Sequence, residues 1–284
     1  MLSEDPIVFL NGKFTPRSKA TISVMDRGFL FGDGIYEVIP VYGGRLFRLE
    51  EHLDRLNNSL KAIRIESPYR HGKWRQIMER LLVGTGDQSI YLQITRGVAA
   101  KRDHAFPVSC EPTVFAMCSP IQPAGNGHTG VRAITLQDTR WQRCDIKAIT
   151  LLANILLRQE AIDQGCTEAI LIRDGRVTEG AASNVFVVID GVLQTPAKGN
   201  DILPGITRDL IVELAGANGI PVKEGPIAAQ ALESADEIWL TSSTREILPV
   251  IELDGLKIAD GRPGPVWQKM HGLLQGFKKS LLPS

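Results

Sequence analysis

The chain has 284 residues, 43% of them hydrophobic and 23% charged, which suits one large or two medium globular domains. Lysine plus arginine and aspartate plus glutamate both total 32, and this zero net charge argues against the broad basic surface of a nucleic-acid-binding protein. No apolar run is long enough to span a bilayer, and Met1–Pro6 lacks the pattern of a secretory signal.

The first part of the chain alternates between strands and amphipathic helices. Asn11-Gly12 between two apolar runs predicts a β-hairpin with a type I′ turn. The glycine-rich stretch Asp26–Gly34 is typical of a connection. Apolar spacing then predicts strands over 35–42, 89–95 and 113–118, and helices over 49–63 and around 74–82.

A segment rich in proline and glycine, Pro120–Gly130, is the best candidate for a linker. We therefore expect an N-terminal domain over 1–120, a linker over 121–130 and a C-terminal domain over 131–284. The C-terminal part is predicted to contain helices over 149–164, 207–217 and 266–277, and strands over 131–136, 169–173, 176–178, 185–189, 192–193, 237–241 and 250–252. Because hairpins outnumber βαβ patterns, the fold class is predicted to be α+β.

The cysteines and histidines suggest neither a metal site nor a disulfide framework. The four cysteines are far apart in sequence and form no C-x-x-C pair, and the five histidines show no H-E-x-x-H pattern. Reduced thiols in the cytoplasm are the simplest expectation.

Lys147 is the first candidate for chemistry. Ile146 precedes it and Ala148 and Ile149 follow it, so the amine is drawn toward apolar surroundings. Burial lowers the pKa of a lysine, and a neutral lysine can form a Schiff base with a carbonyl compound. A solvated lysine at the start of a helix is nevertheless the more frequent arrangement, and this stretch alone favours it.

Other candidates also have ordinary explanations. Arg55 falls near the buried face of the helix over 49–63, where an arginine needs an anionic partner. Gly205–Thr207 precedes a helix, so it offers either an anion site or a plain threonine cap. Thr241–Thr244 ends a strand with four hydroxyl groups, which suits either phosphate binding or a polar turn.

Two further candidates lie near hairpins and loops. Glu179 follows a hairpin strand and is either an exposed carboxylate or a partner for a cationic ring nitrogen. Arg102 and His104 are two residues apart in an extended segment, so their side chains project the same way and could bind a carboxylate. A charged surface loop is the simpler explanation of this pair.

The order and spacing of these signals resemble the class IV (fold-type IV) pyridoxal-phosphate aminotransferases, and most closely their D-amino-acid branch. The resemblance covers nearly the whole chain through separate blocks: 26–28, 31–37, 52–56, 95–97, 143–147, 168–171, 177–180, 183–186, 205–208 and 241–242. It implies a two-domain α+β fold, with a smaller N-terminal α/β domain and a larger C-terminal domain that has a barrel-like β core and anchors the cofactor.

The resemblance also implies roles for the candidate residues. Lys147 would form the Schiff base with pyridoxal 5′-phosphate and move the proton in the 1,3-transfer. Glu179 would face the pyridine nitrogen. The residues implied to bind the phosphate are Arg55, Ile206, Thr207, Ser242 and Ser243.

Substrate choice is implied by a second group of residues. Tyr36, Arg102 and His104 stand where D-specific members hold the substrate α-carboxylate. The expected reaction moves an amino group between a D-amino acid, such as D-alanine or D-glutamate, and 2-oxoglutarate or pyruvate. In the family the Arg-x-His loop reaches the neighbouring subunit, so a homodimer with active sites at the interface is implied.

Three alternatives stay open. Branched-chain L-amino-acid transaminases and aminodeoxychorismate lyases share the cofactor residues, but neither is expected to keep Tyr36 together with Arg102 and His104. A vitamin-B6-binding protein without turnover is the third, and the presence of both Lys147 and Glu179 argues against it.

Overall fold

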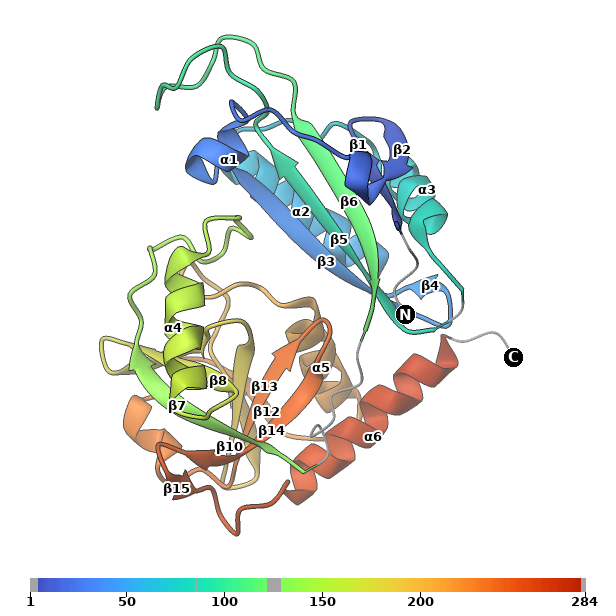
Figure 1. The fold of residues 1–284 in the computed structure, drawn as a ribbon. Coiled ribbons are helices and arrows are strands. Elements are labelled where there is room, and N and C mark those ends of the chain that lie inside the picture. The colour runs from blue at the N-terminus through green and yellow to red at the C-terminus, as the bar shows by residue number, and fades with distance from the viewer. Residues whose placement is uncertain (1–4, 85, 122–128, 282–284) are drawn as a thin grey trace. The chain divides into compact units, whose positions relative to one another are not determined.

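The computed structural model describes residues 5–84, 86–121 and 129–281. They form two compact units (Figure 1). The first contains the chain up to Ile121 together with Ile146–Thr150, and the second contains 129–145 and 151–281. The segment Ile146–Thr150, which we expected within the C-terminal domain, thus belongs to the first unit. Most of the expected linker lies outside the described residues.

The first unit is built on a six-stranded antiparallel sheet of order β2-β1-β6-β5-β3-β4. Its strands are β1 Ile7–Leu10, β2 Lys13–Pro16, β3 Gly34–Tyr42, β4 Arg45–Leu46, β5 Gln88–Thr95 and β6 Thr113–Pro120. The predicted hairpin is confirmed, because Leu10 pairs with Lys13 across Asn11-Gly12, where both turn residues have positive φ. The three predicted strands of this unit are confirmed as well.

Two helices, α2 Leu49–Ala62 and α3 His71–Leu81, pack against this sheet (Figure 1). The apolar row of α2 enters the core, where Leu53, Leu56 and Leu60 are buried against Ile39 and other strand residues. The spacing of leucines in the sequence therefore reports the buried face of α2 correctly.

The glycine-rich stretch before β3 differs from the prediction of a plain connection. It contains a short helix, α1 Arg27–Phe31, and a 3₁₀ turn, η1 Arg17–Lys19, precedes it. The Asp26 side chain accepts a hydrogen bond from Gly28 N and so caps α1. Gly32, with a φ of 67°, ends the helix in the left-handed conformation.

The second unit has a nine-stranded mixed sheet, with the path β12-β11-β10-β13-β14-β7-β8-β9 and β15 paired to β14. Its strands are β7 Val131–Gln137, β8 Glu168–Arg173, β9 Arg176–Gly180, β10 Asn184–Ile189, β11 Val192–Thr195, β12 Val222–Glu224, β13 Glu237–Ser242, β14 Glu246–Leu253 and β15 Leu256–Lys257. The last strand of the path, β9, also contacts β10, so the sheet curls upon itself. Buried valine, isoleucine and leucine side chains fill this curled sheet.

The helices of the second unit are α4 Leu152–Asp163, α5 Ile206–Ala217 and α6 Pro265–Ser280, with a 3₁₀ turn η2 Ala229–Leu232. The predicted start of the first of these at 149 was wrong. Ile149 N donates to Gly34 O, and Tyr36 N donates to Lys147 O, so the backbone there pairs with β3 and is not available to a helix. The apolar run after Lys147 is therefore divided: it belongs to the first unit up to Thr150 and to the second unit from Leu151 onward.

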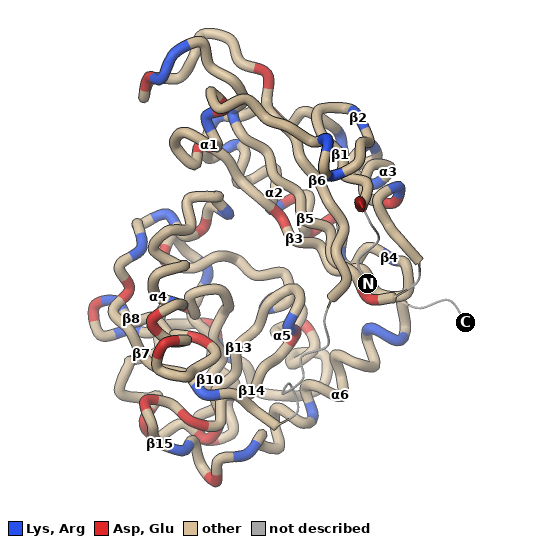
Figure 2. Tube along the Cα trace, viewed as in Figure 1, with Lys and Arg blue, Asp and Glu red and all other residues tan. Residues whose placement is uncertain are grey.

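Charged residues of both signs are interspersed along both units (Figure 2). Within the described ranges, no helix combines the length and the apolar character needed to cross a membrane. The same ranges contain no group of three or more histidine, cysteine, aspartate or glutamate side chains placed to hold a metal ion.

Candidate active site

Lys147 is held through its backbone by the first unit. Its N–H donates to Ser59 Oγ of α2 at 3.2 Å, and its carbonyl accepts from Tyr36 N of β3 at 2.9 Å. Ile146 and Ala148 on either side are buried in the core of this unit. The lysine therefore stands on an extended segment fixed from both sides, and it does not begin a helix.

A tyrosine ring lies beside the Lys147 amine, and a second tyrosine stacks on the first. Nζ lies 4.3 Å from the centroid of the Tyr36 ring. Tyr36 in turn stacks on Tyr91 of β5, with ring centroids 5.8 Å apart. Burial, followed by the nearby Tyr36, raises the pKa of Tyr91 to about 12, so its phenol stays protonated and donates to Gln93 Oε1. The structure thus brings together Lys147 and Tyr36, two of the predicted residues.

Arg55 has the anionic partner that its position on α2 required. Glu37 of β3 accepts from Arg55 Nε and Nη2, both at 2.8 Å, and Glu37 Oε2 also lies 2.8 Å from His52 Nδ1. All three side chains are buried, and Glu37 is completely inaccessible to solvent. We call Glu37, His52 and Arg55 the α2 cluster.

Charge keeps Glu37 ionised despite its burial. Burial alone would raise the pKa of the Glu37 carboxyl, but the Arg55 guanidinium and the His52 hydrogen bond outweigh it and hold the pKa well below its ordinary value. For His52, burial is the largest effect and lowers the pKa. The pair Glu37–Arg55 is therefore charged, and His52 donates to it as a neutral imidazole.

Glu179, at the end of β9, is held by three donors of the second unit. Arg140 Nη1 binds its Oε1, while Asn184 Nδ2 and Leu203 N donate to Oε2 at 3.1 and 3.0 Å. Asn184 Nδ2 also donates to Leu203 O at 2.8 Å. These contacts fix the carboxylate from three elements, so Glu179 is no freely moving surface acid.

Behind Glu179 lies a buried chain of alternating charges. Asp138 accepts from Arg140 Nε and Nη2 at 2.9 and 2.8 Å, and Arg173 Nη2 lies 3.0 Å from the same carboxylate. Burial raises the pKa of Asp138, but hydrogen bonds and charge from Arg140 bring it below its ordinary value. Burial likewise opposes the charge on Arg140, yet Asp138 and Glu179 together raise its pKa. The chain of charges thus sets the orientation of Arg140 and, through it, of Glu179.

The N-terminus of α5 lies beside this network. Helix α5 begins at Ile206, one residue earlier than predicted, and its cap residue Gly205 supplies no side-chain hydrogen bond. A Cβ at Gly205 would come within 1.9 Å of Asn184 Oδ1, so only glycine allows this close approach. The first-turn N–H groups of α5, including those of Ile206 and Thr207, are not used by the helix ladder and can bind an anion.

A buried hydroxyl adds to this site. Thr241 pairs with Asn184 across β13 and β10, and cross-strand partners share one face of a sheet. Its Oγ1 is buried and has no hydrogen-bond partner within the described residues. Ser242 ends β13, and Ser243 stands in the turn to β14. The second unit therefore brings Glu179, the start of α5 and the end of β13 together around Asn184.

Arg102 and His104 lie on the loop between β5 and β6, which extends past the sheet beside α1 (Figure 1). Both reach the same ring: Arg102 Cζ is 4.9 Å from the Phe31 centroid, and the His104 ring centroid is 5.4 Å from it. Arg27 holds the loop by donating to the carbonyls of Asp103, His104 and Ala105. The structure brings Arg102 and His104 together, and both are exposed; no contact of either with Tyr36 is found within the described residues.

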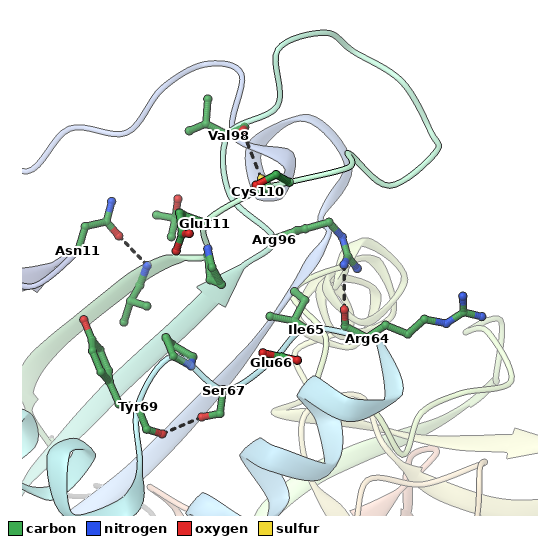
Figure 3. A pocket seen from close by; sticks show the side chains of 15 residues that line it. Asn11, Arg64, Ile65, Glu66, Ser67, Tyr69, Arg96, Val98, Cys110 and Glu111 are labelled. Carbon is green, nitrogen blue, oxygen red and sulfur yellow. Dashed lines mark hydrogen bonds between the residues drawn. The ribbon is translucent and has the colours of Figure 1, made fainter.

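A large open cavity of about 1030 Å³ lies elsewhere in the first unit (Figure 3). Asn11, Arg64, Tyr69, Arg96 and Cys110 are among its lining residues. Its polar groups mostly serve the fold: Arg96 donates to Arg64 O, and Cys110 Sγ donates to Val98 O (Figure 3). None of the predicted site residues lines this cavity.

Comparison with known proteins decides the family. The model of amino-transferase class IV matches residues 34–253. D-alanine aminotransferases from Listeria monocytogenes serotype 1/2a (strain 10403S) and Staphylococcus aureus (strain N315) are 43% and 40% identical to this chain, over 93% and 96% of each chain respectively. The chain is a class IV aminotransferase.

Solved structures agree with this assignment. A branched-chain amino acid aminotransferase from Escherichia coli superimposes with a TM-score of 0.89 at 26% identity, over 99% of this chain and 97% of the other. The branched-chain aminotransferase of the archaeon Thermoproteus uzoniensis, solved with norvaline, gives a TM-score of 0.86 at 29% identity, over 97% of this chain and 95% of the other. These similarities confirm the predicted two-domain α+β architecture of fold-type IV with its curled β core.

The sequence interpretation missed several residues that organise the site of this aminotransferase. Glu37 was part of a recognised block but received no role, and Arg140 and Asn184 were not singled out. The need of Arg55 for an anion was the one available signal for Glu37. For Arg140 and Asn184 the sequence carries no such signal, because their contacts with Glu179 depend on how β7, β9 and β10 are arranged.

Proposed function

We propose that this aminotransferase uses pyridoxal 5′-phosphate to move an amino group between a D-amino acid and a 2-oxo acid. D-alanine or D-glutamate is the donor, and 2-oxoglutarate or pyruvate is the acceptor. The observation that carries the proposal is the retention of Tyr36, Arg102 and His104 together with a fixed Lys147, in a chain whose curated relatives are named D-alanine aminotransferases.

The residues present fit a phosphate-bearing cofactor. In the second unit, the start of α5, which has no side-chain cap, and the buried hydroxyl of Thr241 offer hydrogen-bond donors to an anion. In the first unit, Arg55 offers a guanidinium already oriented by Glu37. Lys147 and Arg55, together with Glu179, Ile206, Thr207, Ser242 and Ser243, would hold the cofactor.

When bound, the cofactor supplies a carbonyl that condenses with amino groups and a ring that accepts the negative charge left at the substrate Cα. The carboxylate of Glu179 would face the ring nitrogen and favour its protonated form. The Lys147 amine, once neutral, would take the proton from the substrate Cα as a base. As an acid it would then donate the proton at the second carbon of the 1,3-transfer. The Tyr36 ring, 4.3 Å from Nζ, limits the directions that this amine can take.

Recognition of the substrate carboxylate falls to Tyr36, Arg102 and His104. The guanidinium and the imidazole converge on the Phe31 ring and present donors to solvent. A carboxylate held there and by the Tyr36 hydroxyl fixes which face of Cα presents its hydrogen to Lys147. The proposed preference for the D-isomer depends on this orientation.

The proposed assembly is a homodimer. Both Arg102 and His104 are exposed, and Phe106 on the same loop is about half exposed at 51%. An exposed aromatic and an arginine on one ordered loop are typical of a protein–protein contact. In this assembly the loop of one copy completes the carboxylate site of the other.

A second candidate is transamination of branched-chain L-amino acids, which the similarity to branched-chain enzymes favours. The two candidates share Lys147, Arg55 and Glu179. They differ in the carboxylate-binding residues, because the L-specific enzymes are not expected to keep Arg102 and His104. We therefore rank it second.

The test follows the visible absorption of the purified protein with bound cofactor. D-alanine should bleach this band within a single turnover, whereas L-leucine should leave it unchanged. Lys147→Ala should remove the lysine-dependent band and lower turnover roughly a thousandfold, the size of acid–base catalysis by one side chain. Lys73→Ala, an exposed lysine on α3, is the control and should behave as wild type. Bleaching by L-leucine alone would establish the second candidate instead.

A further inference from the structure

The α2 cluster links two functions that the proposed reaction needs from the first unit. His52, Arg55 and Ser59 are spaced by three and four residues, so they share one side of α2. Arg55 and His52 bind Glu37, while Ser59 binds the backbone of Lys147. Glu37 follows Tyr36 directly, and Tyr36 binds Lys147 from the other side. One helix and one strand therefore set both the direction of Arg55 and the place of Lys147.

Stability alone is a poor reason for this arrangement. Removing a carboxylate and a guanidinium from water costs several kcal/mol each, and buried ion pairs replaced by well-packed apolar residues often leave a protein equally stable or more stable. Glu37 is completely buried and Arg55 is 6% exposed, so this cost applies in full. In some proteins a buried pair of this kind is retained because it fixes one arrangement of its groups.

The geometry of the pair provides such an orientation. A guanidinium is planar, with its N–H groups in a rigid fork. Two bonds of 2.8 Å from Nε and Nη2 to the two oxygens of Glu37 fix both the plane and the direction of the opposite edge. The bond from His52 to Glu37 Oε2 in turn fixes the carboxylate, since it prevents rotation about the last bond of the side chain.

We propose that Glu37 is a positioning residue that holds Arg55 in the one orientation that binds the cofactor phosphate, and that His52 supports it. Glu37 touches neither cofactor nor substrate in this role. The inference rests on the proposed function, because it assumes that pyridoxal phosphate binds and that Arg55 receives its phosphate. It adds a residue whose effect is confined to the phosphate end of the cofactor.

The test compares two probes, pyridoxal 5′-phosphate and pyridoxal, which differ only in the phosphate. Each is titrated into the apoprotein and followed by absorbance and by quenching of tryptophan fluorescence. In Glu37→Gln one donor of Arg55 faces an amide N–H₂ in place of an oxygen. Arg55 then loses one of the two bonds that orient its guanidinium, so affinity for pyridoxal phosphate should fall about tenfold or more. Affinity for pyridoxal should stay at the wild-type value.

Matched variants separate positioning from a general loss of structure. Glu50→Gln changes an exposed glutamate on the same helix and should alter neither affinity. Arg55→Lys should lose the preference for the phosphate, and adding Glu37→Gln to it should cause no further loss, because both changes remove one interaction. Glu37→Asp keeps the charge but shortens the side chain, so it should show the same selective loss if Glu37→Gln does not fold.

The outcomes distinguish this inference from the proposed function. If the wild-type protein shows no preference for pyridoxal phosphate over pyridoxal, the proposed cofactor site is wrong. If the wild type shows the preference and Glu37→Gln keeps it, the positioning role is wrong while the cofactor site stands. Equal losses for both probes would mark Glu37 as a structural residue only.

Discussion

Glu168 is a buried carboxyl group that the proposed reaction does not use. It stands at the start of β8 with no exposed surface, and its contacts are long: Ala169 N at 3.3 Å, Ser183 Oγ at 3.5 Å and Arg245 Nη1 at 3.7 Å. Burial raises the pKa of Glu168, and the charges of Arg158 and Arg245 oppose this only in part. Unlike Glu37, it is not paired closely enough to offset its burial.

This difference gives a prediction for Glu168→Gln. A carboxyl whose pKa is raised in the folded state binds more protons there than in the unfolded chain, so its contribution to stability falls as pH rises above its ordinary value of 4.5. At pH 8 the variant should therefore be more stable than wild type, by about 1 kcal/mol, and the difference should shrink toward pH 4. Urea unfolding at both pH values measures it.

Glu160→Gln is the control, because Glu160 is an exposed glutamate on α4. It should change the free energy of unfolding at neither pH. A variant Glu168→Gln that is less stable than wild type at pH 8 would show that the carboxylate is charged and usefully paired with the two arginines.

At the scale of elements, α5 depends on how closely its cap residue Gly205 approaches β10. Gly205 lies against Asn184 Oδ1, and Asn184 is itself fixed because it donates to Glu179 and to Leu203 O. The asparagine cannot move without releasing the Glu179 carboxylate. Helix α5 thus couples the proposed phosphate site to the proposed ring-nitrogen site within one unit.

Gly205→Ala should disturb both ends of that coupling. The added Cβ would meet Asn184 Oδ1 at 1.9 Å, and overpacking of this kind costs about 1–3 kcal/mol. Urea unfolding should show this loss, and affinity for pyridoxal phosphate should fall with it. Gly216→Ala on the same helix has open space at its Cβ position and should instead stabilise the protein by roughly 0.5–1 kcal/mol. If Gly205→Ala is as stable as wild type, the Asn184 side chain can move away and make room for the added methyl group.

At the scale of the whole molecule, the proposed homodimer can be tested by complementation. One variant is Lys147→Ala, and the other carries Arg102→Ala with His104→Ala. Refolded together in equal amounts, half of the dimers should be mixed. If the loop serves the other copy, each mixed dimer has one complete site, so activity should return to about a quarter of the wild-type value. Each variant refolded alone is the control.

A different result would place the loop in its own subunit. In that case each mixed dimer has one site that lacks Lys147 and one that lacks the Arg102–His104 pair. No complete site forms, so activity should stay at the level of the variants refolded alone. Light scattering on the same samples gives the number of subunits. A monomer with full activity would contradict the proposed assembly.

Much of the fold follows from local sequence patterns. The Asn11-Gly12 hairpin, the leucine row of α2 and the alternation of β5 are each set by residues within a few positions of one another. Order and spacing of separate blocks were enough to indicate the family and to single out Lys147, Glu179 and Arg55. The start of α4 and the helix α1 were not predicted, because competing backbone partners and an aspartate cap decided them.

The sequence by itself determined which residue types are present and which face of a helix or strand they occupy. Only the tertiary structure decided their partners: Ser59 and Tyr36 for the Lys147 backbone, Glu37 for Arg55, and Arg140 for Glu179. The physical reason is that periodicity reports burial, whereas a hydrogen bond between distant positions depends on the register and packing of whole elements. A polar group that is buried at each of these positions needs a hydrogen-bond partner, and the arrangement of strands and helices determines which residue that partner is.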